Sequence, residues 1–177
     1  MQFIDEAAVT AAAGNGGDGI IAWRREKYVP KGGPAGGGGG HGGNVYVRAT
    51  TALTTLVEFR FRRHFAADSG KAGSTSNKSG HSAEDLVIDV PVGTMVYRAP
   101  EGQEEAFLAD LADDGARVLV AKGGRGGQGN QHFATATRQA QRFAEKGESG
   151  EICALRFELR LLADCCVVGL PNAGKST

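Results

Sequence analysis

Glycine recurs at every third residue in several stretches of this chain, and this spacing constrains the fold more than any other feature. The clearest rows are Gly33, Gly36, Gly39 and Gly42, then Gly37, Gly40 and Gly43, then Gly123, Gly126 and Gly129. Three residues make one turn of a polyproline II helix, so each row leaves one face of such a helix without side chains. Backbones can approach closely at such faces. The spacing therefore predicts a compact bundle of glycine-rich helices.

Collagen and a flexible linker are the two alternatives for a chain with 28 glycines. Collagen needs a long unbroken repeat that is rich in proline, whereas these rows are short and the chain has only 5 prolines. A linker is not expected to be interrupted by residues 23–30, Trp-Arg-Arg-Glu-Lys-Tyr-Val-Pro, whose apolar side chains are able to pack. The compact bundle is the better interpretation.

Strand-like runs separate the glycine stretches, at 44–50, 85–98, 116–124 and 151–164. In the first, Val45 and Val47 alternate with Tyr46 and Arg48. Pro91 and Gly93 predict an edge, a bend or a break in the second. In the last, alternation is most regular, and one predicted face holds Cys153, Leu155, Phe157, Leu159 and Leu161.

Helical spacing is found only at 104–114, where Phe107, Leu108 and Leu111 predict a short helix. A boundary is expected near Leu162, because the continuously apolar run after Asp164 is typical of a buried parallel strand. The fold class expected is mainly β with glycine-rich coil.

Composition points to a reduced, non-membrane environment. The three cysteines, Cys153, Cys165 and Cys166, form no C-x-x-C pair, which favours reduced thiols in the cytosol over a disulfide framework or zinc site. The first residues lack the basic start and apolar core of a secretory signal, and no apolar run approaches a membrane span.

Charge is balanced overall but segregated along the chain. The formal net charge is +0, yet acids predominate in 81–115 and bases in 116–147. Such segregation is compatible with a localised nucleic-acid face, and equally with ordinary solvated surfaces.

A phosphate-binding motif ends the sequence. It fits G-x-x-x-x-G-K-[ST] at every fixed position, with the residues Gly169, Leu170, Pro171, Asn172, Ala173, Gly174, Lys175 and Ser176. Glycines let backbone N–H groups converge on an anion. Lys175 is expected to reach the β- and γ-phosphates, and the Ser176 hydroxyl is expected to ligate Mg²⁺.

The other parts of a P-loop GTPase are missing. No D-x-x-G occurs, and 77–80, Asn-Lys-Ser-Gly, imitates a guanine-reading motif without its Asp and upstream of the P-loop. We therefore expect a fragment of a longer protein, cut after the first element of a second domain. Its catalytic residues are expected beyond the fragment, which is therefore not expected to hydrolyse a nucleotide.

Four segments together resemble the Obg family of GTPases: 3–34, 85–94, 120–133 and 158–177. The resemblance implies an Obg domain over 1–162, in which polyproline-II-type helices sit on a small β-barrel. It implies that 163–177 begins a Ras-like GTPase domain truncated after the P-loop. It also implies GTP or GDP and Mg²⁺ as ligands, GTP hydrolysis by the intact protein, and docking on rRNA of the large ribosomal subunit during its assembly in the cytoplasm.

Basic side chains in and around the glycine regions are the candidates for rRNA contact: Arg24, Arg25, Lys27, Lys31, Lys71, Lys78, Arg138 and Arg142. The sequence departs from the family at Ala35, Gly38 and His41, where acids are common. This makes the region less negative. His41 is interpreted as a solvated loop histidine, not a metal ligand.

Two other functions remain open. The domain could be a protein-binding module that engages a partner such as a stress-response protein, or the motif could belong to an ATPase or kinase. Binding to RNA weakens steeply with salt, whereas an apolar protein interface does not, so salt titration separates the first alternative from rRNA docking.

Overall fold

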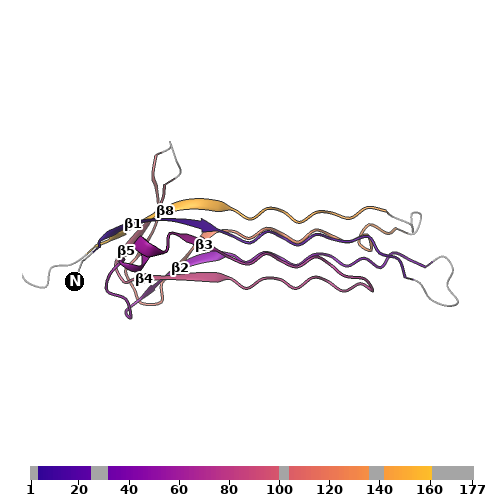
Figure 1. Ribbon diagram of the computed structural model, residues 1–177, viewed down its shortest axis with the longest axis horizontal. Coiled ribbons are helices and arrows are strands. Elements are labelled where there is room, and N and C mark those ends of the chain that lie inside the picture. The colour runs from indigo at the N-terminus through magenta and orange to yellow at the C-terminus, as the bar shows by residue number, and fades with distance from the viewer. Residues whose placement is uncertain (1–3, 25–31, 100–103, 136–141, 161–177) are drawn as a thin grey trace, which may run out of the picture.

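The computed structural model describes residues 4–24, 32–99, 104–135 and 142–160 (Figure 1). Within these ranges the chain forms eight strands and one short helix. They are β1 (Glu6–Ala12), β2 (Val45–Thr50), α1 (Glu58–Phe61), β3 (His64–Ala66), β4 (Leu86–Pro91), β5 (Thr94–Arg98), β6 (Ala106–Leu111), β7 (Arg117–Ala121) and β8 (Ile152–Leu159). The strands gather at one end of an elongated molecule, and extended segments run from them to the other end (Figure 1).

The strands form two open sheets. One has the order β3-β1-β8-β5-β6, and the other has the order β4-β2-β7. In the larger sheet only the β1–β3 pair is parallel, and in the smaller sheet only β2–β4 is. The mainly β class is confirmed. The expected small barrel is met only in part, because hydrogen bonding among the described strands gives two sheets.

The long pair of β1 and β8 is central to the larger sheet. Val9 lies opposite Leu155, and Ala11 lies opposite Cys153. Every second residue of β8 from Cys153 to Leu159 is buried, which confirms the predicted face apart from Leu161, a residue outside the described ranges. Val45 and Val47 of β2 are fully buried, whereas Tyr46 is partly buried and Arg48 exposed, so the predicted alternation is confirmed.

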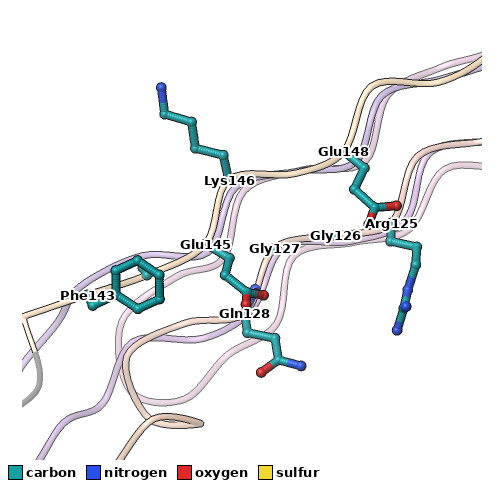
Figure 2. A pocket seen from close by; sticks show the side chains of 9 residues that line it. Arg125, Gly126, Gly127, Gln128, Phe143, Glu145, Lys146 and Glu148 are labelled. Atoms are coloured by element: carbon teal, nitrogen blue, oxygen red, sulfur yellow. The ribbon is translucent and has the colours of Figure 1, made fainter.

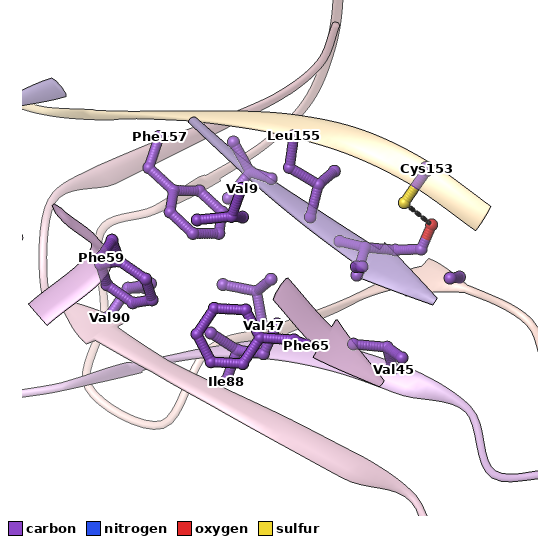
Figure 3. Close-up of a cluster of buried hydrophobic side chains, with 14 of the residues drawn as sticks. Val9, Val45, Val47, Phe59, Phe65, Ile88, Val90, Cys153, Leu155 and Phe157 are labelled. Carbon is purple, nitrogen blue, oxygen red and sulfur yellow. Dashed lines mark hydrogen bonds between the residues drawn. The ribbon is translucent and has the colours of Figure 1, made fainter. Parts of the chain in front are cut away.

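Three phenylalanines pack α1 against β3 and β8 of the larger sheet (Figure 3). The Phe59 ring meets that of Phe157 edge-on, with centroids 5.2 Å apart, and lies 5.8 Å from that of Phe65. Phe157 is fully buried, and valines of β2 and β4 close the core from the opposite side (Figure 3). This apolar cluster is where the two sheets pack together.

The predicted break within 85–98 is confirmed. β4 ends at Pro91 and β5 begins at Thr94, and the two strands belong to different sheets. Gly93 has a φ of 84°, which other residues rarely adopt. The buried Thr94 hydroxyl donates a hydrogen bond of 2.6 Å to the Pro91 carbonyl across the turn.

The predicted helix at 104–114 is wrong, because this region contains β6. Its residues pair with β5, Leu111 opposite Thr94 and Phe107 opposite Tyr97, with a register shift between Val96 and Tyr97. Leu111 is buried, whereas Phe107 is 55% exposed. Hydrogen bonds to β5 stabilise this edge strand, and this tertiary pairing outweighs the helical spacing of its apolar residues.

Candidate nucleic-acid interface

Six extended segments form the part of the molecule beyond the sheets, here termed the glycine bundle. They are numbered first to sixth along the chain and cover 13–24, 32–44, 67–75, 77–85, 122–130 and 142–151. Figure 1 shows them side by side over most of their length. They carry no strand assignment, and one isolated bridge, between Trp23 and Pro34, lies among them.

Backbone hydrogen bonds join the segments at every third residue. From the first to the second segment, Gly14 N–H donates to the Gly43 carbonyl at 2.9 Å and Gly17 N–H donates to Gly40 at 2.8 Å. From the second to the fifth, Gly39 N–H donates to Gly127 at 2.8 Å. Because the repeat is three, each row of one segment faces a different neighbour.

The first segment uses its other rows in the same way. Gly16 N–H and Gly19 N–H donate to Glu148 and Glu145 of the sixth segment, at 2.8 and 2.9 Å. The third segment bonds in turn to the first, where Gly70 N–H donates to the Asn15 carbonyl at 2.8 Å. The first segment is therefore bonded to neighbours on several sides.

Glycine is required at these contacts because the neighbouring backbone occupies the place of a side chain. A Cβ on Gly39 would lie 1.9 Å from the Gly17 carbonyl oxygen, and one on Gly126 would lie 2.0 Å from that of Gly39. No real Cβ approaches so closely. The predicted packing of bare backbone faces is confirmed at these positions.

The remaining row of the central segments carries polar side chains that accept further backbone N–H groups. Asn15 Oδ1 accepts from Gly150 N–H at 2.9 Å, and three residues later Asp18 Oδ1 accepts from Gly147 N–H at 2.8 Å. Asn44 Oδ1 accepts from Gly123 N–H at 2.9 Å. These side chains therefore accept hydrogen bonds from backbone N–H groups that have no carbonyl partner in the neighbouring segments.

His41 belongs to that row and has a structural contact. Its Nδ1 accepts a hydrogen bond of 3.3 Å from Gly126 N–H, so the side chain is exposed but not simply solvated. Ala35 is only 3% exposed and adds nothing to the surface. The expected loss of surface acids therefore concerns Gly38 and His41 alone.

Asn130 closes the bundle near the end away from the sheets. It is fully buried, and its Oδ1 accepts from Gly36 N–H at 2.8 Å. Its Nδ2 donates to the Ala22 carbonyl at 3.0 Å. One amide thus holds the first and second segments to the fifth, where these segments no longer pair through glycine alone.

The six segments form three pairs, and in each pair the chain runs out from the sheets to the far end of the bundle and then back. The first segment leaves β1 and the second returns to β2; the third leaves β3 and the fourth returns to β4; the fifth leaves β7 and the sixth returns to β8. We term this end the distal end. Among the described residues it includes 22–24, 74–78, 130–135 and 142–144 (Figure 1).

Three of the predicted rRNA-contact residues lie at the distal end. Arg24, Lys78 and Arg142 are exposed there. Lys78 follows Ser76 and Asn77, whose positive φ angles of 60° turn the chain between the third and fourth segments. Lys71 is also exposed, partway along the third segment.

The other predicted site residues lie outside the described ranges. These are Arg25, Lys27, Lys31 and Arg138 for rRNA contact, and the whole phosphate-binding motif, 169–176. The predicted buried strand after Leu162, with Cys165 and Cys166, also lies outside them.

The fifth and sixth segments add residues that were not among the candidates. Lys122, Arg125 and Gln128 form the exposed row of the fifth segment, opposite its two glycine rows. Their three-residue spacing could have identified them. A shallow groove lies along these segments, with Phe143 at one end and Arg125 toward the other (Figure 2).

Among the residues that the structure describes, no group of three or more His, Cys, Asp or Glu side chains is placed to hold a metal ion. Likewise, no helix among these residues is long and apolar enough to cross a membrane.

Fold and surface together define a class: a mainly β domain that carries a hydrogen-bonded glycine bundle with basic side chains at its distal end. Known proteins give the family. The model of the GTP1/OBG family matches residues 4–161. The chain belongs to the GTP1/OBG family.

Relatives with the name GTPase Obg match the whole chain. The protein of Chlorobaculum parvum is 54% identical over 177 residues, covering 100% of this chain and 52% of the relative. That of Moorella thermoacetica is 57% identical over 176 residues, covering 99% of this chain and 41% of the relative. The chain spans about half the length of the curated relatives it matches.

Proposed function

We propose that this chain is the docking domain of a GTP-binding and GTP-hydrolysing ribosome-assembly factor, and that its distal end contacts rRNA of the large ribosomal subunit. The observation that carries the proposal is the glycine bundle itself. Its segments are fixed to each other by backbone hydrogen bonds and present basic side chains at one end.

The bundle suits contact with a large RNA for a mechanical reason. We infer that its segments are polyproline-II-type helices, because that helix also repeats every three residues. A bundle anchored at one end by packed sheets can hold charges at a distance from the core. Its basic side chains can then reach into a crevice of the RNA that is too narrow for the sheets.

The nucleotide part of the proposal depends on 169–176. We assign 1–162 to the docking domain and 163–177 to the start of a Ras-like GTPase domain. The backbone of this loop would bind the phosphates of GTP or GDP, Lys175 would neutralise the β- and γ-phosphates, and Ser176 would ligate Mg²⁺. Guanine specificity is supported by the name GTPase Obg of the relatives.

Co-sedimentation with purified large ribosomal subunits tests the docking. The full-length protein is compared with Arg142→Glu at the distal end and with Arg63→Glu, the same charge change at an exposed position beside the sheets. Binding should weaken for Arg142→Glu, with the slope of log K against log salt reduced by about 1 or more. Arg63→Glu should bind as the wild type does. Equal effects of the two variants would contradict the proposal.

Nucleotide chemistry needs a separate assay. In the full-length protein, Lys175→Ala should abolish GTP binding and hydrolysis. The 177-residue chain should not hydrolyse GTP, so measurable hydrolysis by this chain that Lys175→Ala removes would contradict the domain assignment.

A protein-binding module that couples a GTPase to stress-response partners is the second candidate. It is favoured by exposed apolar side chains at the sheet end of the molecule, including Phe61 of α1 (82% exposed) and Ile152 of β8 (75% exposed). A partner bound there should resist salt and be lost with Phe61→Glu, whereas rRNA docking should not change.

A further inference from the structure

Two phenylalanine rings lie together at the distal end. Phe133, just after the fifth segment, and Phe143, in the sixth, have centroids 4.9 Å apart and planes inclined by 68°. Phe143 is 54% exposed, and Phe133 is partly buried. An edge-to-face contact covers only one face of the ring that is met. The pair therefore holds an aromatic surface at the end of the groove in Figure 2.

Basic side chains lie beside this surface and further along the groove. Arg142 precedes Phe143, while Lys146 and Arg125 line the same groove, and all three are exposed. Glu145 and Glu148 also line the groove. The Glu145 carboxylate, however, accepts a hydrogen bond of 3.3 Å from Gln128 N–H, which directs part of its charge to the backbone. The groove is lined by two bases and two acids, and the exposed Arg142 adds one further base beside Phe143, so this end of the groove favours an anionic ligand.

The protein has a second exposed aromatic pair, which differs from the first in being covered by a charged side chain of the protein itself. Phe107 and Tyr97, on the edge of the larger sheet, also meet edge-on, and Phe107 is similarly exposed. There the Arg156 guanidinium lies 4.5 Å from the Tyr97 ring centroid and is paired with Glu105 at 2.7 Å. That pair is occupied by the protein's own ion pair, whereas no such ion pair is seen at the described residues around Phe143.

We propose that Phe143, supported by Phe133, stacks on an unpaired nucleobase of the bound RNA while Arg142 and Lys146 contact the adjoining phosphates. The inference rests on the proposed rRNA docking and specifies its chemistry. An aromatic face is tolerant of base identity but needs a base that is free of its neighbour, as in loops and bulges of RNA. The distal end would then select single-stranded RNA, which charge alone does not do.

Substitutions at Phe143 in the full-length protein, with purified large ribosomal subunits as the ligand, test the stacking. Phe143→Ala should weaken binding on the order of 10-fold at every salt concentration. The salt slope should stay as in the wild type, because no phosphate contact is removed. Phe143→Tyr and Phe143→Trp should bind as the wild type does. Phe107→Ala, the matched change in the other exposed pair, should have no effect.

Phe143→Leu separates stacking from simple apolar contact, since leucine can pack on Phe133 but has no aromatic face. Weak binding by this variant, with an unchanged thermal midpoint, is expected. Wild-type binding by Phe143→Leu would overturn the inference in favour of an apolar protein-like contact. Wild-type binding by Phe143→Ala, with Arg142→Glu still impaired, would overturn the stacking but leave rRNA docking intact. Failure of the wild type to bind the subunit would contradict both.

Discussion

A Cβ placed on Gly39 would lie 1.9 Å from the carbonyl oxygen of Gly17, a residue of a different segment of the bundle. Gly17 in turn donates its N–H to the neighbouring Gly40 carbonyl at 2.8 Å. Two backbones thus touch where most folds would interpose side chains. The absence of a side chain at Gly39 is a condition for the hydrogen bonds on either side of it.

Gly39→Ala should destabilise the domain by about 3 kcal/mol, because the added methyl group must push two rigid backbones apart. Gly33→Ala is the matched control. A Cβ on Gly33 meets no atom within 4 Å, so this variant should unfold at the wild-type midpoint. Chemical denaturation of both variants gives the comparison. Equal stability of the two would mean that the segments are not in the contact described.

Asn130→Ala should cost about 2 kcal/mol, since it leaves the buried Gly36 N–H without its acceptor and removes one of the two donors to the Ala22 carbonyl. Gln131→Ala, at the exposed next residue, should be neutral. Thermal unfolding followed by circular dichroism measures both. A neutral Asn130→Ala would mean that water replaces the amide at this site. The Asn130 amide would then not be what holds the three segments together.

Phe157→Ala should cost roughly 3–5 kcal/mol, because a fully buried ring that contacts Phe59 would be replaced by a cavity. Phe61→Ala removes a ring that is 82% exposed and should change stability by less than about 0.5 kcal/mol. Urea denaturation of the two variants separates a core that joins the sheets from a surface aromatic.

Periodicity predicted the larger features of the fold. The three-residue glycine rows predicted backbone-to-backbone packing, and the two-residue alternation predicted β2 and the buried face of β8. In both cases, a repeated pattern of side chains corresponds to a repeated contact. The break at Gly93 was predicted from residue type instead, because proline and glycine interrupt strands.

Local spacing did not predict elements whose stability comes from a distant partner. β1 has the sequence Glu-Ala-Ala-Val-Thr-Ala-Ala, in which alanines disguise the alternation, yet it pairs with β8 along its whole length. β6 was predicted as a helix for the same reason. The spacing of its own residues carries no information about its pairing with β5. Phe143 was not predicted as a candidate either, since a single aromatic residue in a loop indicates neither its exposure nor its contact with Phe133.

Alkaline pH should weaken the domain partly through Cys153. Burial raises the pKa of this thiol above its ordinary value, and its Sγ lies 3.3 Å from the Val120 carbonyl oxygen. The folded state holds the proton more tightly than the unfolded state does. This contribution is fully present below the unfolded pKa and is lost as pH rises through the raised folded pKa. In Cys153→Ala, the free energy of unfolding should fall less between pH 7 and pH 10 than in the wild type. An identical fall in both would exclude the thiol as the cause.

Native-state amide hydrogen exchange, read residue by residue by NMR, tests the rigidity of the glycine bundle most directly. The N–H groups of Gly14, Gly17, Gly39, Gly42 and Gly127 each donate to a carbonyl of another segment. They should therefore exchange at least 100-fold more slowly than an unstructured chain, with similar protection in all of them because they belong to one cooperative unit. Exchange of these glycines at the unstructured rate, while β1 and β8 remain protected, would show that the rows are a mobile tether and would contradict the account.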